Sequence, residues 1–335
     1  MSVGATEGDR TSSPAADTLG ELGESAALAR IFPRLPVASS TLVGPGDDAA
    51  VLTAADGRFV VTTDMMIHGP DFRLAWSSPH DLGWKAAASN LSDVAAMGAV
   101  PTALVVALAA PAGTAIGFLE GFADGLRDGC AAMAPGCGVV GGDLSVSATL
   151  TIAVTAFGDL RGREPVLRSG ARIGDTVAVS GPLGLAAEGI RVLFAQAMVD
   201  GRPSADGLAA LRAASPAVAA QLAPTPPIAD GPLAAIAGAT AMIDLSDGLA
   251  LDARRVAHAS GVALDLTLER VGSEAALLGG EDHSLLATFP PTSELPGGCR
   301  EIGRVAAGTG VLVGGVPYSP RGGWDPYDGW DGQLG

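Results

Sequence analysis

The sequence predicts an α/β or α+β protein of two domains. Short runs rich in β-branched residues alternate with longer Ala-rich segments, which is typical of strands and helices packed in layers. The chain has 335 residues, a length that usually forms about two domains. A stretch around residues 160–170 divides it almost equally, so we expect domains at 25–160 and 161–335. Residues 1–24 lack an apolar segment of any length, and we expect a disordered tail there.

The first half of the chain shows clear start and stop signals for its elements. The strongest helix begins near Ser78, has an Ala-rich body and stops at Gly98, with Pro101 beyond. The run FVVTTDMM predicts a strand that ends at Asp64. The predicted order is a short amphipathic helix at 24–35, a strand within 59–66, the helix just described, a strand at 102–111, a helix at 119–134, a strand at 138–145 that runs into a Gly-rich turn, and a strand at 148–160.

The second half repeats the alternation. A turn and a strand within 168–184 lead through a Gly-containing junction into a helix at 185–197. Residues 199–230 are rich in Ala and Pro, which indicates short helical pieces and loops. In AMIDLSDGLALDARR, an apolar strand reaches two aspartates and a helix follows, ending at Ser260 and Gly261. Further strands are expected at 262–266 and 283–289.

Charge and cysteine usage exclude several classes of function. The 36 acidic residues against 20 basic ones give a net charge of −16, which disfavours nucleic acid and anionic membranes as partners. An anionic ligand would therefore need divalent cations between itself and the protein. Three cysteines without a C-x-x-C pair predict no disulfide framework and no zinc site. No apolar run reaches about 18 residues, so we expect a soluble cytoplasmic protein.

Aspartates recur beside Gly, Ser or Thr in five separate segments. Hard cations such as Mg²⁺ prefer oxygen ligands, and carboxylates that converge from several segments could supply them. Each segment alone also has a structural explanation, as a turn or a helix N-cap. The spacing leaves that explanation and a multi-metal phosphate site equally open. The segments are GPGDDAAVL with Asp47 and Asp48, TTDMM with Thr62, Thr63 and Asp64, NLSDVAAMG with Asp93, GGDLS with Gly142 and Asp143, and DLSDG with Asp244, Ser246 and Asp247.

Other familiar sites are missing from the sequence. It contains no G-x-x-x-x-G-K-[ST] P-loop, no dinucleotide fingerprint and no G-x-S-x-G nucleophile elbow. The four histidines form no H-x-H or H-x-x-x-H pair that would predict a metal centre.

Taken in order, the motifs resemble those of the thiamine-monophosphate kinases, within the AIR-synthase-like or PurM-like superfamily of ATP-binding proteins. The resemblance spans residues 25–330 approximately and rests on GPGDDAAVL, TTDMM, NLSDVAAMGA, GGDLS, LRSGARIGD, IDLSDGL and GGEDHSL. It implies a two-domain architecture, with an N-terminal mixed sheet that forms a barrel in a homodimer and a C-terminal α/β domain. It also implies transfer of the γ-phosphate of ATP to thiamine monophosphate, the last step of thiamine diphosphate biosynthesis. Several Mg²⁺ ions, and usually K⁺, accompany that reaction.

The resemblance also implies roles for individual residues. The implied Mg²⁺ ligands are Asp48, Thr62, Thr63, Asp64, Asp93, Asp143, Asp244 and Asp247. The implied ATP contacts are Gly142, Asp143, Arg168 and Ser246, and Asp143 and Asp247 are the implied catalytic residues. Asp71, Glu281 and Trp324 are implied to contact the thiamine end, with Trp330 as the alternative to Trp324.

A phosphate acceptor is already ionised near pH 7, so direct in-line transfer needs no strong general base. Three features nevertheless depart from the family pattern. The segment PTPP at 224–227 lacks the arginine that often follows P-x-P. Asp71 stands where a histidine is common, and His283 replaces the usual tyrosine after GGED. The alternatives are another enzyme of the superfamily, such as a selenophosphate synthase, a hydrogenase-maturation dehydratase or a purine-pathway ligase, or a non-catalytic nucleotide- or cation-binding regulator.

Overall fold

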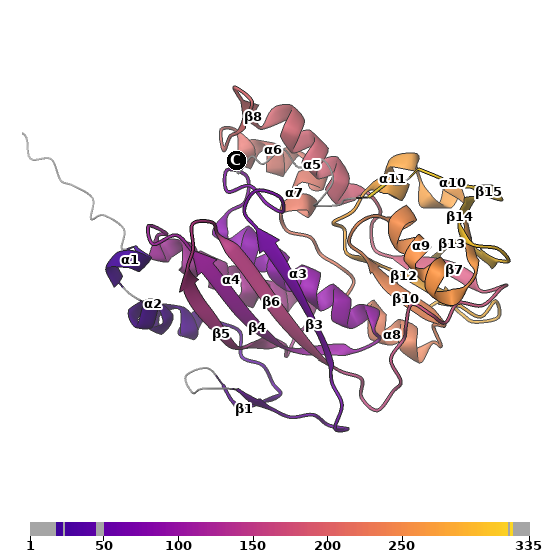
Figure 1. The fold of residues 1–335 in the computed structure, drawn as a ribbon, viewed down its shortest axis with the longest axis horizontal. Coiled ribbons are helices and arrows are strands. Elements are labelled where there is room, and N and C mark those ends of the chain that lie inside the picture. The colour runs from indigo at the N-terminus through magenta and orange to yellow at the C-terminus, as the bar shows by residue number, and fades with distance from the viewer. Residues whose placement is uncertain (1–17, 23, 45–49, 321, 324–335) are drawn as a thin grey trace, which may run out of the picture.

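The computed structural model of the chain describes residues 18–22, 24–44, 50–320 and 322–323. Figure 1 shows two sheets side by side, the first from the N-terminal half of the chain and the second from the C-terminal half. Both mix parallel and antiparallel strand pairs. The predicted α/β class is confirmed, and the chain changes from one sheet to the other between Asp159 and Thr176.

The first sheet has four strands in the order β3 (Val60–Ile67), β6 (Thr151–Asp159), β4 (Val100–Ala110) and β5 (Gly138–Val146). Its strands β4 and β5 run parallel, and the other neighbours run antiparallel. Helices α3 (Pro79–Ala96) and α4 (Ile116–Met133) cover one face, and their apolar side chains join those of the strands in one buried cluster. The opposite face leaves large apolar side chains exposed, such as Met65 and Val146.

Helix α3 forms as predicted and connects the two halves. Ser78 is its N-cap, Asp81 completes a capping box, and Gly98 after its end has a φ of +73°. Gly83 lets α4 pack directly against α3, because a Cβ there would lie 2.0 Å from the carbonyl oxygen of Phe122. Side chains from the C-terminal half of α3 therefore have a fixed position relative to both sheets.

The second sheet has seven strands and a separate core. Its order is β10 (Ala241–Leu245), β12 (Ser284–Phe289), β7 (Thr176–Ser180), β13 (Arg300–Ala306), β11 (Ala263–Leu266), β14 (Gly310–Val313) and β15 (Val316–Pro317). Helices α9 (Leu249–Ser260), α10 (Leu268–Val271) and α11 (Glu274–Leu278) contribute side chains to its main buried cluster. Strands β13 to β15 had no counterpart in the sequence prediction.

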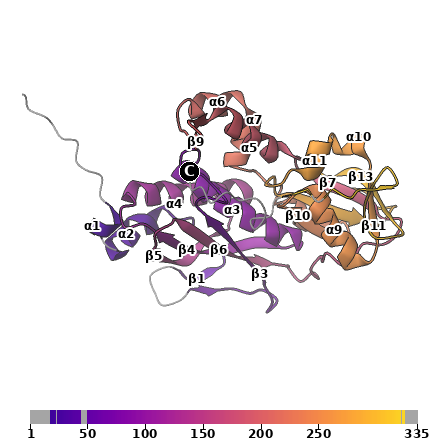
Figure 2. The same ribbon diagram turned by 45° about the horizontal axis from the view of Figure 1, so that its top comes forward.

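The segment between β7 and β10 forms a small helical layer. Figure 2 shows α5 (Leu185–Gln196), α6 (Leu208–Ala214) and α7 (Pro216–Leu222) grouped above α3. The short ribbon of β8 (Met198–Val199) and β9 (Arg202–Pro203) closes this layer, and α8 (Asp230–Ile236) follows it. Trp76 is buried there among Leu193, Val218 and Leu222. Helices α5 and α7 form one wall of the pocket described below.

Three predicted element boundaries were wrong. Strand β3 does not end at Asp64 but continues to Ile67, because Asp64 is paired with Val154 in the ladder to β6. The GGDLS segment is not a turn, because pairing with β4 carries β5 through it. Residues 19–22 of the expected tail form α1 (Leu19–Leu22), where Thr18 bonds Glu21 and the two terminal leucines pack on the core.

The remaining elements lie near the N-terminus. Helix α2 (Glu24–Ile31) and the 3₁₀ turn η1 (Phe32–Arg34) lead to the two-stranded ribbon of β1 (Thr41–Val43) and β2 (Val51–Leu52). In the part of the chain that the structure covers, no helix combines the length and apolar character needed to span a membrane.

Candidate active site

Four carboxylates from four different elements lie within electrostatic reach of one another. Asp64 comes from β3, Asp93 from α3, Asp244 from β10 and Asp247 from the turn before α9. Thr62 Oγ1 donates to Asp93 Oδ2 at 2.8 Å, which fixes the Asp93 carboxylate toward β3. The structure therefore brings together four of the predicted acids, with Thr62 beside them. We call these four aspartates the carboxylate site.

Like charges dominate this carboxylate site. Burial raises the pKa of Asp93 to about 7, and the neighbouring charges of Asp244 and Asp64 add to the rise. Burial also raises the pKa of Asp64, and Asp244 is among the acids that add to it. His283 opposes both shifts but does not cancel them. The chain thus holds more negative charge here than its own cations neutralise.

His283 is a contact that sequence reasoning missed. It is 5% exposed, and its Nδ1 lies 3.5 Å from Asp244 Oδ2 and 3.5 Å from Ser92 Oγ. Burial lowers the pKa of His283, but the bond to Asp244 and the charge of Glu281 raise it by more. The imidazole is therefore biased toward its charged form beside Asp244.

The loop that carries His283 is strained. Glu281 has a φ of +69° and His283 a φ of +51°, a region that residues other than glycine seldom occupy. Two backbone bonds hold the loop, from Glu281 N to Ser246 O at 2.8 Å and from His283 N to Leu245 O at 3.1 Å. These bonds tie the loop to the end of β10 and to the turn that follows it.

The start of α9 is stabilised by a second acid. Asp252 is fully buried, and its Oδ2 accepts from the amides of Asp247 at 3.2 Å and Gly248 at 3.1 Å. Arg255 contacts Asp252 and lies 2.5 Å from Asp247 Oδ2. Burial raises the pKa of Asp252 to about 7, against the lowering effect of Arg255. Asp247 is thus held by its backbone and by Arg255, and it does not serve as the helix N-cap.

The donor set fits a hard divalent cation. Among the described residues, no three His, Cys, Asp or Glu side chains lie close enough together to hold a metal ion by themselves. Mg²⁺, however, usually takes only one or two carboxylates and completes its shell with water and phosphate oxygens. Asp64 and Asp93, whose pKa values are raised by burial and by neighbouring acids, would also be stabilised in their charged form by such a cation. Asp48, the remaining predicted ligand of the N-terminal half, lies outside the described residues.

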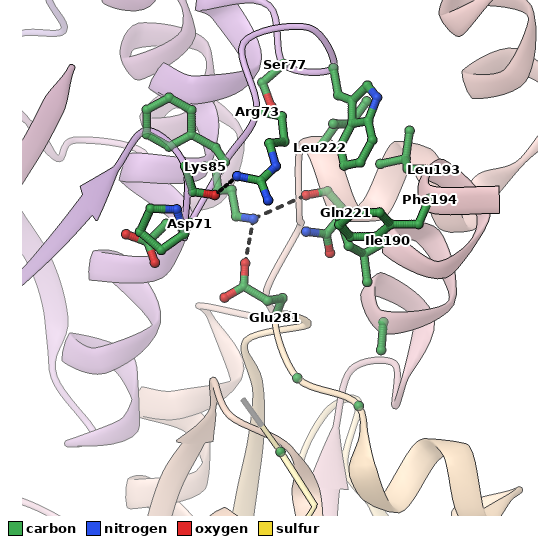
Figure 3. A pocket seen from close by; sticks show the side chains of 18 of the residues that line it. Asp71, Arg73, Ser77, Lys85, Ile190, Leu193, Phe194, Gln221, Leu222 and Glu281 are labelled. Atoms are coloured by element: carbon green, nitrogen blue, oxygen red, sulfur yellow. Dashed lines mark hydrogen bonds and ion pairs between the residues drawn. The ribbon is translucent and has the colours of Figure 1, made fainter. Parts of the chain in front are cut away.

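A pocket of about 350 Å³ opens beside the carboxylate site. Figure 3 shows Ile190, Phe194 and Leu222 on one side of it and Asp71, Lys85 and Glu281 on the other. The Trp76 and Phe194 rings meet edge to face, with their centroids 5.0 Å apart. The pocket therefore combines an aromatic and aliphatic wall with a charged one.

The polar wall is tied together by specific contacts. Lys85 Nζ lies 2.5 Å from Glu281 Oε2, and Asp71 Oδ2 accepts from the amide of Ile67 at 2.7 Å. Burial raises the pKa of Asp71, an effect that the bond from Ile67 reduces. Two of the predicted substrate contacts, Asp71 and Glu281, thus line one cavity. Trp324, the third, lies outside the described residues.

The other predicted contacts lie apart from the carboxylate site. Register places Met65 of β3, Ala107 of β4 and Asp143 of β5 in one row across the sheet, so Asp143 is about 14 Å from β3. Gly142 and Asp143 instead line a cavity of about 400 Å³ along the β5 edge. Arg168 is exposed, and its carbonyl accepts from Ser260 at the end of α9 remote from Asp247.

Two further predicted residues have different positions. Ser246 adjoins Asp247, and its carbonyl anchors Glu281. Thr63 points to the open face of the first sheet, away from α3, where its Oγ1 donates to Val154 O at 2.9 Å. Thr62 and Thr63 therefore belong to opposite faces, and only Thr62 touches the carboxylate site.

Comparison with known proteins agrees with this arrangement. A family model described as AIR synthase related protein, N-terminal domain, matches residues 46–160. The thiamine-monophosphate kinase of Mycobacterium tuberculosis is 40% identical over 346 residues, which cover 98% of this chain and 98% of the relative. The chain belongs to the thiamine-monophosphate kinases.

Solved structures of thiamine-monophosphate kinases share the fold. The enzyme from Stenotrophomonas maltophilia K279a has 31% identity and a TM-score of 0.71, covering 87% of this chain and 96% of that one. AaThiL, complexed with AMPPCP and TMP, has 32% identity and a TM-score of 0.68, covering 90% of this chain and 96% of that one. The family resemblance predicted from the motifs is confirmed.

Proposed function

We propose that this chain transfers the γ-phosphate of ATP to thiamine monophosphate, giving ADP and thiamine diphosphate. The observation that carries the proposal is that two binding environments of different chemistry adjoin each other. A site of four aspartates adjoins a pocket with an aromatic wall and two acids, Asp71 and Glu281. The first environment suits phosphates with their cations, and the second suits a cationic aromatic ring. A relative whose structure holds AMPPCP and TMP supports this choice of substrates.

The reaction needs positioning more than acid–base chemistry. An oxygen of the acceptor phosphate attacks the γ-phosphorus in line, and ADP leaves. The acceptor oxygen carries no proton that must be removed near pH 7, so none of the site residues has to act as a general base. Thr62 holds Asp93, Arg255 holds Asp247 and His283 holds Asp244, which keeps the carboxylates in place.

Asp64, Asp93, Asp244 and Asp247 would hold Mg²⁺. When bound there, Mg²⁺ supplies charge neutralisation for the phosphate groups in transfer. Asp247 is the proposed catalytic residue of this group, because it sits at the junction of β10 and α9 and its side chain is 26% exposed, whereas that of Asp244 is 6% exposed. A requirement for K⁺ and the roles of Asp48, Thr63 and Trp324 stay predictions.

We assign the nucleotide to the edge of β5. Gly142 and Asp143 line an apolar cavity there with Leu108, Phe122 and Leu144, which suits the adenine end of ATP. Asp143 would then act on the nucleotide from the opposite edge of the sheet. Ser246 and Arg168 stay predicted ATP contacts, since a long arginine side chain can reach beyond the position of its backbone.

We also propose a homodimer in the cytoplasm. The uncovered face of the first sheet exposes Val61 at 54%, Met65 at 59% and Val146 at 75%, which favours burial against a second copy. In this proposal residues 25–160 form the ATP- and Mg²⁺-binding and dimerisation domain, and residues 161–335 form the second domain. The free Cys130, Cys137 and Cys299 suit a reducing compartment.

The test is a direct assay of the product. Purified protein would be mixed with ATP, Mg²⁺ and thiamine monophosphate, and thiamine diphosphate would be quantified by chromatography, with thiamine as a parallel acceptor. We expect thiamine diphosphate from the monophosphate and none from thiamine. Mg²⁺-dependent ATP binding without this product would show that the acceptor is misassigned.

A further inference from the structure

Lys85 is a buried cation on the wall of the pocket. Its side chain is 7% exposed, and its Nζ lies 2.5 Å from Glu281 Oε2 and 3.5 Å from the carbonyl oxygen of Gln221 (Figure 3). A buried charge is costly unless it is paired, and Glu281 provides that pairing. The Glu281 side chain is 35% exposed and lines the cavity, so a ligand can reach the pair.

The Lys85–Glu281 pair stands between the pocket and the carboxylate site. Lys85 precedes Asp93 by eight residues on α3, which is about 12 Å along the helix axis. Glu281 lies two residues before His283, whose ring contacts Asp244. Glu281 is also close enough for its charge to raise the pKa of Asp64, so the pair lies on the side of the pocket near the carboxylate site.

We propose that Lys85 is a specificity-determining residue that recognises the phosphate already present on the acceptor, and that Glu281 occupies Lys85 until the acceptor binds. This inference rests on the proposed function. An acceptor with an anionic phosphate and a cationic ring can bind both partners, the phosphate at Lys85 and the ring at Glu281. One ion pair within the protein is then exchanged for two between protein and ligand.

The same exchange rejects acceptors without a phosphate. An alcohol with the same cationic ring would attract Glu281 but leave the Lys85 ammonium buried and without an anion. A site built around a buried polar group discriminates strongly against ligands that lack its partner. Lys85 therefore distinguishes a phosphate acceptor from the corresponding hydroxyl acceptor.

Equilibrium binding to the full-length protein tests the ligand preference. Calorimetry would compare thiamine monophosphate with thiamine for the wild type, Lys85→Gln, Lys85→Arg and the control Arg212→Gln. Arg212 lies 2.7 Å from Asp81, which is on the same helix as Lys85. Arg212 itself does not line the pocket. We expect Lys85→Gln to weaken the binding of thiamine monophosphate by about tenfold or more without weakening the binding of thiamine. Lys85→Arg should keep the preference for the monophosphate. Equal weakening of both ligands, or of neither, would overturn the assignment.

A second variant removes the competing anion and uses a simpler probe. In EDTA, inorganic phosphate would be titrated into the wild type, Glu281→Gln and the double variant Lys85→Gln/Glu281→Gln. Glu281→Gln should bind phosphate several-fold more tightly than the wild type because Lys85 is freed, and the double variant should lose this gain. No gain in Glu281→Gln contradicts the inference, whether or not Lys85→Gln folds.

The phosphate titration also separates this inference from the proposed function. Suppose that Glu281→Gln binds phosphate more tightly in a Lys85-dependent way but the protein makes no thiamine diphosphate. Lys85 would then still be a phosphate contact, and thiamine monophosphate would be rejected as the acceptor. Thiamine diphosphate formation without any gain would keep the function and reject the role of Lys85.

Discussion

The carboxylate site and the pocket beside it handle buried charge in opposite ways. In the carboxylate site, Asp64, Asp93 and Asp244 stand close enough for each charge to disfavour the next, and the pKa of Asp93 rises, chiefly through burial, to about 7. In the pocket, Lys85 and Glu281 neutralise each other at 2.5 Å. The first region needs cations from outside the chain, whereas the second is balanced until a ligand replaces its internal partners.

Helix α3 explains how two such regions can be neighbours. It carries Lys85 toward the pocket and Asp93 toward β3, and its capped N-terminus and close packing on α4 make it a rigid support. A rigid element holds charged groups apart at a set distance, so each region keeps its own balance. Variants on either side should therefore have separable effects.

The largest expected effect comes from the carboxylate site. Asp247→Asn removes a charge where phosphate and cation meet, so turnover should fall on the order of 10²- to 10³-fold and the Mg²⁺ dependence should change. Steady-state kinetics with varied Mg²⁺ measure both quantities. Asp206→Asn, at an exposed loop position, is the matched control and should behave as the wild type. Unchanged turnover and Mg²⁺ dependence in Asp247→Asn would remove this residue from the site.

A smaller effect is expected on stability without metal. The pKa of Asp93 rises from 3.8 to about 7 on folding, so the folded chain binds more protons between pH 4 and 7. The favourable contribution of Asp93 to the free energy of unfolding is therefore fully present below about pH 4 and is lost as the pH rises through 7. Asp93→Asn should raise the free energy of unfolding at pH 8 in EDTA by about 2 kcal/mol, and by less at pH 5.

Urea unfolding at the two pH values checks this prediction. Asp265→Asn, in strand β11 of the second sheet, is the control substitution of the same type. If Asp93→Asn destabilises the protein at pH 8, the buried Asp93 carboxylate is not destabilised by burial and by its acidic neighbours as described. In the expected case, Mg²⁺ should reduce the difference in free energy of unfolding between the wild type and Asp93→Asn, because the cation stabilises the charged carboxylates.

The smallest expected effect concerns the apolar wall of the pocket. Phe194 is 50% exposed and packs edge to face on Trp76, so its ring is available to a ligand. Phe194→Ala should raise the KM for thiamine monophosphate about fivefold and leave the KM for ATP unchanged. Leu233→Ala, an exposed apolar change on α8, serves as the control. A parallel rise in the KM for ATP would mean that the two regions are not separate.

Local patterns predicted the parts of this molecule that local physics determines. The caps of α3, the strand–helix junction at Asp244 and Asp247, and the family motifs all follow from short segments of sequence. Asp64 and Asp93 were also expected at one site, and Thr62 joins them by a direct hydrogen bond. The extension of β3 past Asp64 was missed because it depends on pairing with β6, far along the chain.

The missed site residues depend on contacts between distant segments. Lys85 lies in an Ala-rich helix, where a single lysine usually reaches solvent, and only the folded chain shows its pairing with Glu281. His283 reaches Asp244 because β12 pairs with β10 in a particular register. Asp143 reads as part of the same acid pattern, yet three strand spacings separate it from β3. Register and strand order are properties of the whole sheet.

Cation binding tests the contrast between the two regions most directly. The electron paramagnetic resonance signal of free Mn²⁺ would be followed during titration of the wild type, Asp244→Asn and Glu281→Gln in the presence of AMPPCP. We expect Asp244→Asn to lose at least one bound Mn²⁺ and Glu281→Gln to bind as many Mn²⁺ ions as the wild type. Full Mn²⁺ binding by Asp244→Asn, or loss of Mn²⁺ in Glu281→Gln, would contradict this expectation.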